Sequence, residues 1–184
     1  MSDIWVTSDT HFFHANILKF TDRNGSLIRP NFATVSEMNE HMADMWNESI
    51  KPGDKVYHLG DVFVGNEWET FKTFFDKLNG KKRLIVGNHD NIEKLVKLNF
   101  FQKTYMWRMF PEQGLLFSHV PVHQSGLWRN GKPLTNVHGH IHQNNSPQGF
   151  YRNVCVEKTQ YKPVHFEDLL TVRPKAQYEG NTLF

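Results

Sequence analysis

The hydrophobic positions of this chain follow two patterns, one in the first hundred residues and another after them. In the first part, short apolar runs alternate with segments whose apolar residues recur every three or four positions, which is typical of strands alternating with helices. We expect strands at 3–8, 55–59 and 83–86 and helices at 14–20, 36–50, 67–78 and 91–98. In the second part short runs dominate, and we expect strands at 103–109, 115–120, 135–139 and 150–156, then a last helix at 164–170.

This order of elements favours the α/β fold class. It predicts a four-layer α/β/β/α sandwich, in which two mixed β-sheets pack together and helices flank them. A chain of 184 residues can bury a substantial core and is the size of one domain. We expect that domain over 1–172 and a loosely held tail over 173–184.

Residues that bind metals or move protons follow the ends of the apolar runs. They occur in five blocks: Asp9-Thr10-His11, Gly60-Asp61, Gly87-Asn88-His89-Asp90, His119, and Gly139-His140-Ile141-His142. Because α/β sheets place their active sites at the loops beyond strand ends, we expect these blocks to converge.

The paired residues suggest shared metal ions. Asp9 and His11 are two positions apart, so in extended backbone their side chains project to the same side and can hold one ion. His140 and His142 have the same spacing and could serve one ion or two neighbouring ions. Imidazole with carboxylate suits manganese, iron or zinc better than calcium.

Asp61 and Asn88 complete this set in different ways. The carboxylate of Asp61 is the natural bridge between two cations, whereas Asn88 offers a neutral carbonyl oxygen. Two divalent ions would carry more positive charge than Asp9 and Asp61 can cancel, and a phosphate group would supply the missing negative charge. A pair of ions can also acidify a shared water and clamp a phosphoryl group.

The five blocks, in this order, resemble the calcineurin-like metallophosphoesterase superfamily, whose members carry D-x-H, G-D, G-N-H-[DE], H and G-H-x-H. The segments SDTHFFHAN, HLGD and NVCVEKTQYKPV further resemble a small stand-alone group within that superfamily. A single block would be weak evidence, but the ordered combination is specific.

The resemblance implies a role for each matching position. Six side chains would hold two metal ions in sets of three: Asp9, His11 and His142 for the first, and Asn88, His119 and His140 for the second. Asp61 would bridge the ions, and His89 would protonate the leaving oxygen while a metal-bound hydroxide attacks phosphorus. Manganese is the leading metal, with iron, nickel or zinc as alternatives.

The chain departs from the family pattern in two places. Val64 stands where protein-phosphatase members carry an Asp that orients the histidine acid, which disfavours a phosphoprotein substrate. The partner of His89 is therefore open, and Asp90 could either orient it or cap the following helix. Cys155 stands where relatives tend to carry Gly, with no predicted consequence.

Three further residues are candidates for substrate binding. His14 lies close to the first block, and His123 lies on a loop after His119. Arg129, on the same loop, could pair with phosphate oxygens. Each has an alternative interpretation, as a capping or surface histidine or as a solvated arginine.

Composition narrows the possible settings and partners. The net charge of +2 permits an anionic substrate without indicating a nucleic-acid binder, which usually carries a concentrated basic stripe. The single cysteine cannot form an internal disulfide, which fits a reducing compartment. No signal peptide is evident, and no run approaches the ~20 apolar residues of a membrane span. We therefore expect a cytoplasmic protein with no membrane association.

The leading hypothesis is a two-metal phosphodiesterase acting on a small or nucleotide-like substrate. A phosphomonoesterase using the same dinuclear site is the alternative. A nuclease acting on long nucleic acid, or a catalytically silent binding module, is disfavoured because the charge is modest and every expected ligand is present. The sequence does not determine the oligomeric state.

Overall fold

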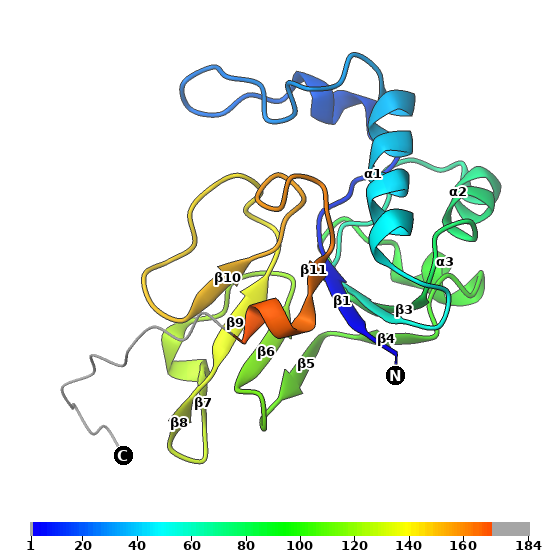
Figure 1. Cartoon of the computed structure of the whole chain (residues 1–184). Coiled ribbons are helices and arrows are strands. Elements are labelled where there is room, and N and C mark those ends of the chain that lie inside the picture. The colour runs from blue at the N-terminus through cyan, green and yellow to red at the C-terminus, as the bar shows by residue number, and fades with distance from the viewer. Residues whose placement is uncertain (1, 171–184) are drawn as a thin grey trace.

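The computed structural model describes residues 2–170, which form two main β-sheets with helices beside them (Figure 1). The five-stranded sheet has the order β11-β1-β2-β3-β4. Its strands are β1 (Ile4–Thr7), β2 (Lys55–His58), β3 (Lys81–Ile85), β4 (Lys103–Tyr105) and β11 (Val164–His165). Strands β1 to β4 run parallel and β11 pairs antiparallel with β1, so the sheet is mixed.

The four-stranded sheet has the order β10-β9-β6-β5. Its strands are β5 (Trp107–Phe110), β6 (Leu115–Ser118), β9 (Thr135–His138) and β10 (Tyr151–Asn153). This sheet is also mixed, because β5 alone runs antiparallel to its neighbour.

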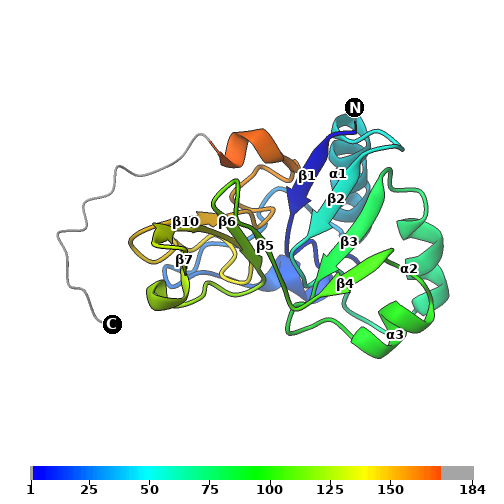
Figure 2. The same ribbon diagram turned by 90° about the horizontal axis from the view of Figure 1, so that it is seen from below.

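Helices α1 (Val35–Ser49), α2 (Trp68–Phe75) and α3 (Ile92–Lys97) cover the outer face of the five-stranded sheet (Figure 2). Thr34 is the N-cap of helix α1, and its side chain accepts a hydrogen bond from the backbone of Glu37. Its residues Met38, Met42 and Trp46 are spaced by four and form one buried stripe against the sheet.

A second core lies between the two sheets. Val6 and Tyr57 of the first sheet pack there with Phe117 and Val137 of the second. The outer face of the second sheet is covered by a thinner layer, made of the 3-10 helix η2 (Gln124–Gly126) and the hairpin of β7 (Trp128–Arg129) and β8 (Lys132–Pro133). Two mixed sheets flanked by helices confirm the predicted fold class.

The structure corrects two predicted elements. The expected strand at 103–109 is two strands, because the chain leaves β4 in one sheet and enters β5 in the other at Met106. The expected helix at 164–170 begins as β11, which pairs with β1, and only then forms the 3-10 helix η3 (Phe166–Leu169). A continuous run of strand-forming residues carries no signal for a change of sheet.

The remaining expectations concern the helix at 14–20, the tail of the chain and membrane spans. The predicted helix at 14–20 is the 3-10 helix η1 (Ala15–Lys19). The predicted tail at 173–184 lies outside the described residues. Within residues 2–170, no helix has the length and apolarity needed to cross a membrane.

Candidate metal centre

The loops that follow β1, β2, β6 and β9 are joined by backbone hydrogen bonds. The amide of Asp9 donates to the carbonyl of Gly60 at 3.0 Å, and the amide of His11 donates to the carbonyl of Asp61 at 3.0 Å. The amide of Gly139 donates to the carbonyl of His119 at 2.8 Å. Blocks far apart in sequence are thereby brought to one end of the two sheets.

Two glycines of these blocks are packed directly against carboxylates. A Cβ atom at Gly87 would lie 2.2 Å from Oδ1 of Asp61, and one at Gly139 would lie 2.2 Å from Oδ2 of Asp9. The Cβ atom at Gly139 would also lie 2.0 Å from Oγ of Ser8. These glycines are required because no side chain fits between the backbone and the acids.

The backbone is left-handed at five of the seven predicted ligands. The φ angles are 58° at Asp9, 47° at His11, 58° at Asp61, 70° at His140 and 49° at His142. Non-glycine residues adopt this region rarely, and such strain concentrates at functional sites. The premise that Asp9 and His11 share a side because their backbone is extended is therefore wrong, although both side chains do reach one cluster.

The side chains form two clusters of possible metal ligands. Within each cluster the ligand atoms lie within 4.8 Å of one another, and the members are Asp9, His11 and His142 in the first, and Asp61, His119 and His140 in the second. Oδ1 of Asn88 adjoins the second cluster, 2.9 Å from Nε2 of His119 and 2.9 Å from Nδ1 of His140. His140 and His142 thus belong to different clusters.

Asp61 lies between the two clusters. Its Oδ2 is 3.6 Å from Nε2 of His11 in the first cluster and 3.4 Å from Nε2 of His119 in the second. Its Oδ1 accepts a hydrogen bond from the backbone of His89 at 2.9 Å, which fixes the orientation of the carboxylate. One oxygen is therefore positioned to face ions on both sides.

The donor set fits metal ions. Both ring nitrogens of His11 are buried, and neither has a hydrogen-bond partner among residues 2–170. Burial and the nearby His142 and Arg29 lower the pKa of His11 to about 2, so its imidazole is neutral and can ligate. Spacings of 2.9–3.4 Å among donors of the second cluster suit an ion about 2.1 Å from each ligand.

The charged groups at the centre perturb one another. Burial raises the pKa of Asp9, although His119 and His142 oppose this effect. Burial alone would lower the pKa of His119, but its interactions with Asp61 and Asp9 raise the pKa to about 9. His119 must lose its proton to ligate, so metal binding at the second cluster releases a proton and weakens as the pH falls.

Hydrogen bonds fix which nitrogen of two histidines faces the clusters. Nδ1 of His119 lies 2.7 Å from the carbonyl of Leu59, which leaves Nε2 toward Asp61. Nδ1 of His142 lies 2.9 Å from Oε1 of Glu157, which leaves Nε2 toward Asp9. Such partners orient the ring and set its tautomer.

Arg29 and Glu157 extend this network and were not predicted. Arg29 is completely buried, and its guanidinium donates to Oε1 of Glu157 at 2.8 and 2.9 Å and to the backbone carbonyls of Asp9 and Thr10. Burial would raise the pKa of Glu157, but Arg29 and His142 lower it to about 2. An acid directly after the apolar run 154–156 is a weak signal for Glu157, whereas Arg29 stands in a polar stretch that predicts exposure.

His89 and His14 lie beside the first cluster. Their ring centroids are 5.6 and 5.5 Å from that of His11. The His89 side chain is exposed, whereas His14 is half-buried, with its Nδ1 inaccessible and without a hydrogen-bond partner in the described part of the chain.

Asp90 has neither of its two predicted roles. Its carboxylate accepts hydrogen bonds from the backbone of Asp61, Val62 and Gly87, so it ties two loops together. The side chain of Asn91, not that of Asp90, caps α3.

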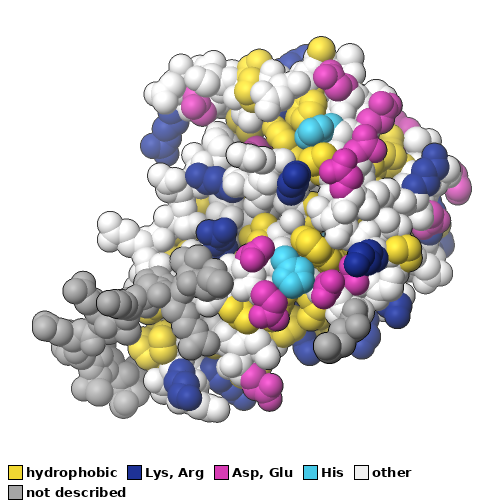
Figure 3. All heavy atoms as spheres, in the orientation of Figure 1, with side chains coloured by type: hydrophobic (Ala, Val, Ile, Leu, Met, Phe, Trp, Pro, Cys, Tyr) yellow, Lys and Arg dark blue, Asp and Glu magenta, His cyan; other side chains and the backbone are white. Residues whose placement is uncertain are grey.

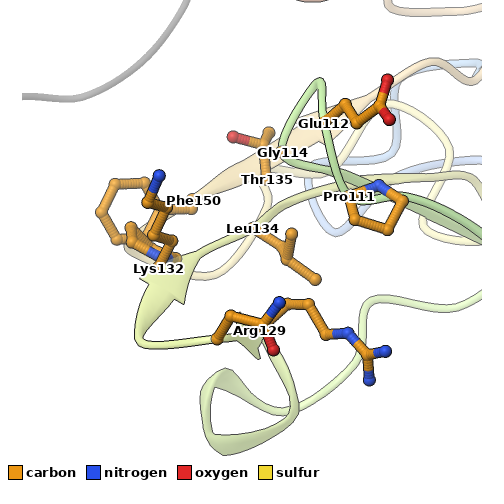
Figure 4. Close-up of a pocket in the computed structure, with 10 residues that line it drawn as sticks. Pro111, Glu112, Gly114, Arg129, Lys132, Leu134, Thr135 and Phe150 are labelled. Atoms are coloured by element: carbon orange, nitrogen blue, oxygen red, sulfur yellow. The ribbon is translucent and has the colours of Figure 1, made fainter.

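No hydrogen bond or ion pair among residues 2–170 joins His123 or Arg129 to the clusters. His123 caps η2, and its Nδ1 accepts from the backbone of Ser125. Arg129 lies on the β7–β8 hairpin and, with Lys132, lines a cavity of about 520 Å³ whose walls include none of the predicted metal ligands (Figure 4). Substrate binding by His123 or Arg129 stays a prediction.

Two clusters of candidate metal ligands, consistent with a dinuclear metal site, lie at one end of an α/β/β/α sandwich. A family model described as calcineurin-like phosphoesterase matches residues 2–180, and the chain belongs to this family. Protein MJ1445 of Methanocaldococcus jannaschii, named as uncharacterized, is 31% identical over 185 residues, which cover 96% of this chain and 94% of that protein.

The chain is also similar to a phage protein and to a solved structure. The gene 66 protein of Mycobacterium phage D29 is 35% identical over 92 residues, which cover 49% of this chain and 41% of that protein. The crystal structure of AQ665 from Aquifex aeolicus, a protein of unknown function, has a TM-score of 0.71 at 24% identity and covers 92% of this chain and 98% of that one. The similarity to AQ665 supports the assignment of the fold.

Proposed function

We propose that this chain is a two-metal phosphodiesterase acting on small or nucleotide-like substrates, with His89 as the general acid. The observation that carries the proposal is the position of Asp61 Oδ2, 3.6 Å from a ligand nitrogen of one cluster and 3.4 Å from one of the other. When bound, two divalent ions would lower the pKa of a shared water and polarise the phosphoryl group.

The residues beside the clusters supply positioning and a proton. The exposed imidazole of His89 is next to His11 and can reach a leaving oxygen at the open side of the centre. Its backbone bond to Asp61 couples its loop to the bridging carboxylate. Burial and the charge of Arg29 lower the pKa of His14, so this side chain can donate a hydrogen bond to a phosphoryl oxygen without adding positive charge.

Two observations favour a small diester. A monoester dianion calls for more cationic groups than a diester monoanion, and the guanidinium of Arg29 is already bound to Glu157 and to backbone carbonyls. On the face drawn in Figure 3, acidic and basic side chains of the described residues are interspersed. Long nucleic acid is bound mainly through concentrated basic surface, and the net charge of +2 is modest, so a small substrate is favoured.

We also propose manganese as the metal and the cytoplasm as the location. The ligands combine imidazole with carboxylate and amide oxygens, a mixture that suits manganese better than calcium. Cys155 is a buried free thiol, as expected in a reducing compartment.

The test is a metal add-back assay on stripped protein. Manganese, iron, nickel and zinc are supplied separately, and turnover of bis-p-nitrophenyl phosphate is compared with that of p-nitrophenyl phosphate. We expect metal-dependent turnover with kcat/KM higher for the diester. Equal or higher kcat/KM for the monoester would assign a phosphomonoesterase, and no turnover with any metal would revive the silent binding module.

The role of His89 is tested with His89→Ala. Loss of a general acid costs about 10²–10⁴-fold in kcat, and the loss should be larger for a dinucleoside monophosphate than for p-nitrophenyl esters, because p-nitrophenolate needs little protonation. His165→Ala is the control, since His165 pairs with Trp5 in the sheet, away from both clusters. Unchanged turnover of the dinucleoside substrate by His89→Ala, with parent metal content, would remove His89 from the mechanism.

A further inference from the structure

An apolar cavity begins at the second metal cluster, and neither the clusters nor His89 explains it. The cavity has a volume of about 740 Å³, and its lining includes Asn88 and His119. It extends from them to the place where β4 and β5, the edge strands of the two sheets, are connected through Met106. A group that enters it therefore lies beside whatever the metal centre binds.

The lining is apolar and partly open to solvent. The exposed fractions of Met106, Trp107 and Val120 are 67%, 59% and 44%, and a cluster of exposed large apolar side chains is typical of a binding site. The hydroxyl of Ser118, also in the lining, donates to the carbonyl of Val120 at 2.6 Å. Among residues 2–170, the lining contains no Lys, Arg, Asp or Glu. A sugar or a charged group would lose hydrogen bonds to water here without replacement.

We propose that this cavity binds a planar, uncharged aromatic group carried by the phosphoester substrate. The inference rests on the proposed function, because it places the phosphate at the metal clusters. Trp107 supplies an aromatic face, and Met106 and Met109 supply thioethers, which make favourable contacts with rings. The cavity volume lies within the range of small-molecule sites, about 300–1,000 Å³.

The test uses two phosphonates that share a head group and resist hydrolysis. Phenylphosphonate and methylphosphonate are titrated calorimetrically into metal-loaded protein. We expect phenylphosphonate to bind about tenfold more tightly, which is within the contribution of stacking on an aromatic side chain. Trp107→Ala should abolish this preference and leave methylphosphonate affinity unchanged.

Two variants serve as controls. Trp128→Ala removes another exposed tryptophan, which is 46% exposed and outside the lining, and it should keep the preference for phenylphosphonate. Met106→Ala should reduce the preference by a smaller factor. It replaces Trp107→Ala as the deciding variant if the urea unfolding midpoint indicates that Trp107→Ala does not fold.

The outcomes separate this inference from the proposed function. Equal affinity for the two phosphonates, in protein that hydrolyses a diester with metal, overturns the aromatic site and leaves the enzyme. Absence of metal-dependent hydrolysis of any phosphoester rejects the proposed function and this inference with it. A dimer in sedimentation that Trp107→Ala converts to monomer also overturns the inference, because a second copy would then cover the cavity.

Discussion

The substitution Gly139→Ala would put a methyl group where the side chains of Ser8 and of Asp9, a member of the first cluster, already lie. Its Cβ would be 2.0 Å from Ser8 Oγ and 2.2 Å from Asp9 Oδ2, whereas ordinary contact begins at 3.4 Å. The Asp9 carboxylate would have to retreat by the difference, 1.2 Å. Ligand distances in metal sites tolerate deviations of about 0.2 Å. We therefore expect Gly139→Ala to lose the ion of the first cluster.

The variant should also lose stability. Overpacking a well-packed site costs about 1–3 kcal/mol, and urea unfolding of metal-free protein measures this cost. Gly139 is not among the glycines with positive φ, so the alanine backbone is allowed and the effect is steric. Metal stoichiometry is measured by elemental analysis after dialysis, and affinity by calorimetric titration.

Gly53→Ala is the matched control. A Cβ at Gly53 would have nothing within 4 Å, and Gly53 also lacks a positive φ. We expect its free energy of unfolding to stay within about 0.5 kcal/mol of the parent and its metal content to be unchanged. The steric argument is refuted if Gly139→Ala binds two ions with parent affinity and unfolds at the parent urea concentration.

Three further predictions concern buried charges. Arg29→Met leaves the Glu157 carboxylate buried without its guanidinium partner, and it should lower the free energy of unfolding in urea by about 3–5 kcal/mol. The double variant with Glu157→Gln should recover part of this loss, and fully additive effects of the two substitutions would contradict the pairing. Hydrogen bonds from the backbone of Lys51 and Asp3 lower the pKa of Asp54 in the folded protein. The ionised carboxylate of Asp54 therefore contributes its full stabilisation above the ordinary pKa of Asp, and this stabilisation is lost as the pH falls through the lowered pKa of the folded state. The acid limb of a plot of unfolding midpoint against pH should accordingly be shallower for Asp54→Asn, and an unchanged limb would exclude this contribution. Asp61→Asn should reduce the bound metal from two ions toward one by elemental analysis, and retention of both at parent affinity would argue against a bridge.

Much of the fold follows from local pattern. Helix α1 could be predicted because Met38, Met42 and Trp46 repeat at helical spacing behind a capping threonine, and each of these signals acts within a few residues. The change of sheet at Met106 could not be predicted in this way. It depends on which edge strand each half of the run can pair with, and that pairing is decided by distant parts of the chain.

The chemistry of the candidate site divides in the same way. The sequence by itself determined the types of the candidate ligands and their order, since the five blocks in the chain supply the members of the two clusters that form. From spacing alone His140 and His142 could share one ion or serve two, and the tertiary structure places them in different clusters, as the family resemblance implied. Only the tertiary structure decided that the backbone is left-handed at five of the seven candidate ligands. It also decided that Arg29, in a polar stretch that predicts exposure, is completely buried against Glu157. Composition near a residue predicts its average exposure, but a buried ion pair forms only where two remote segments meet and exclude water together.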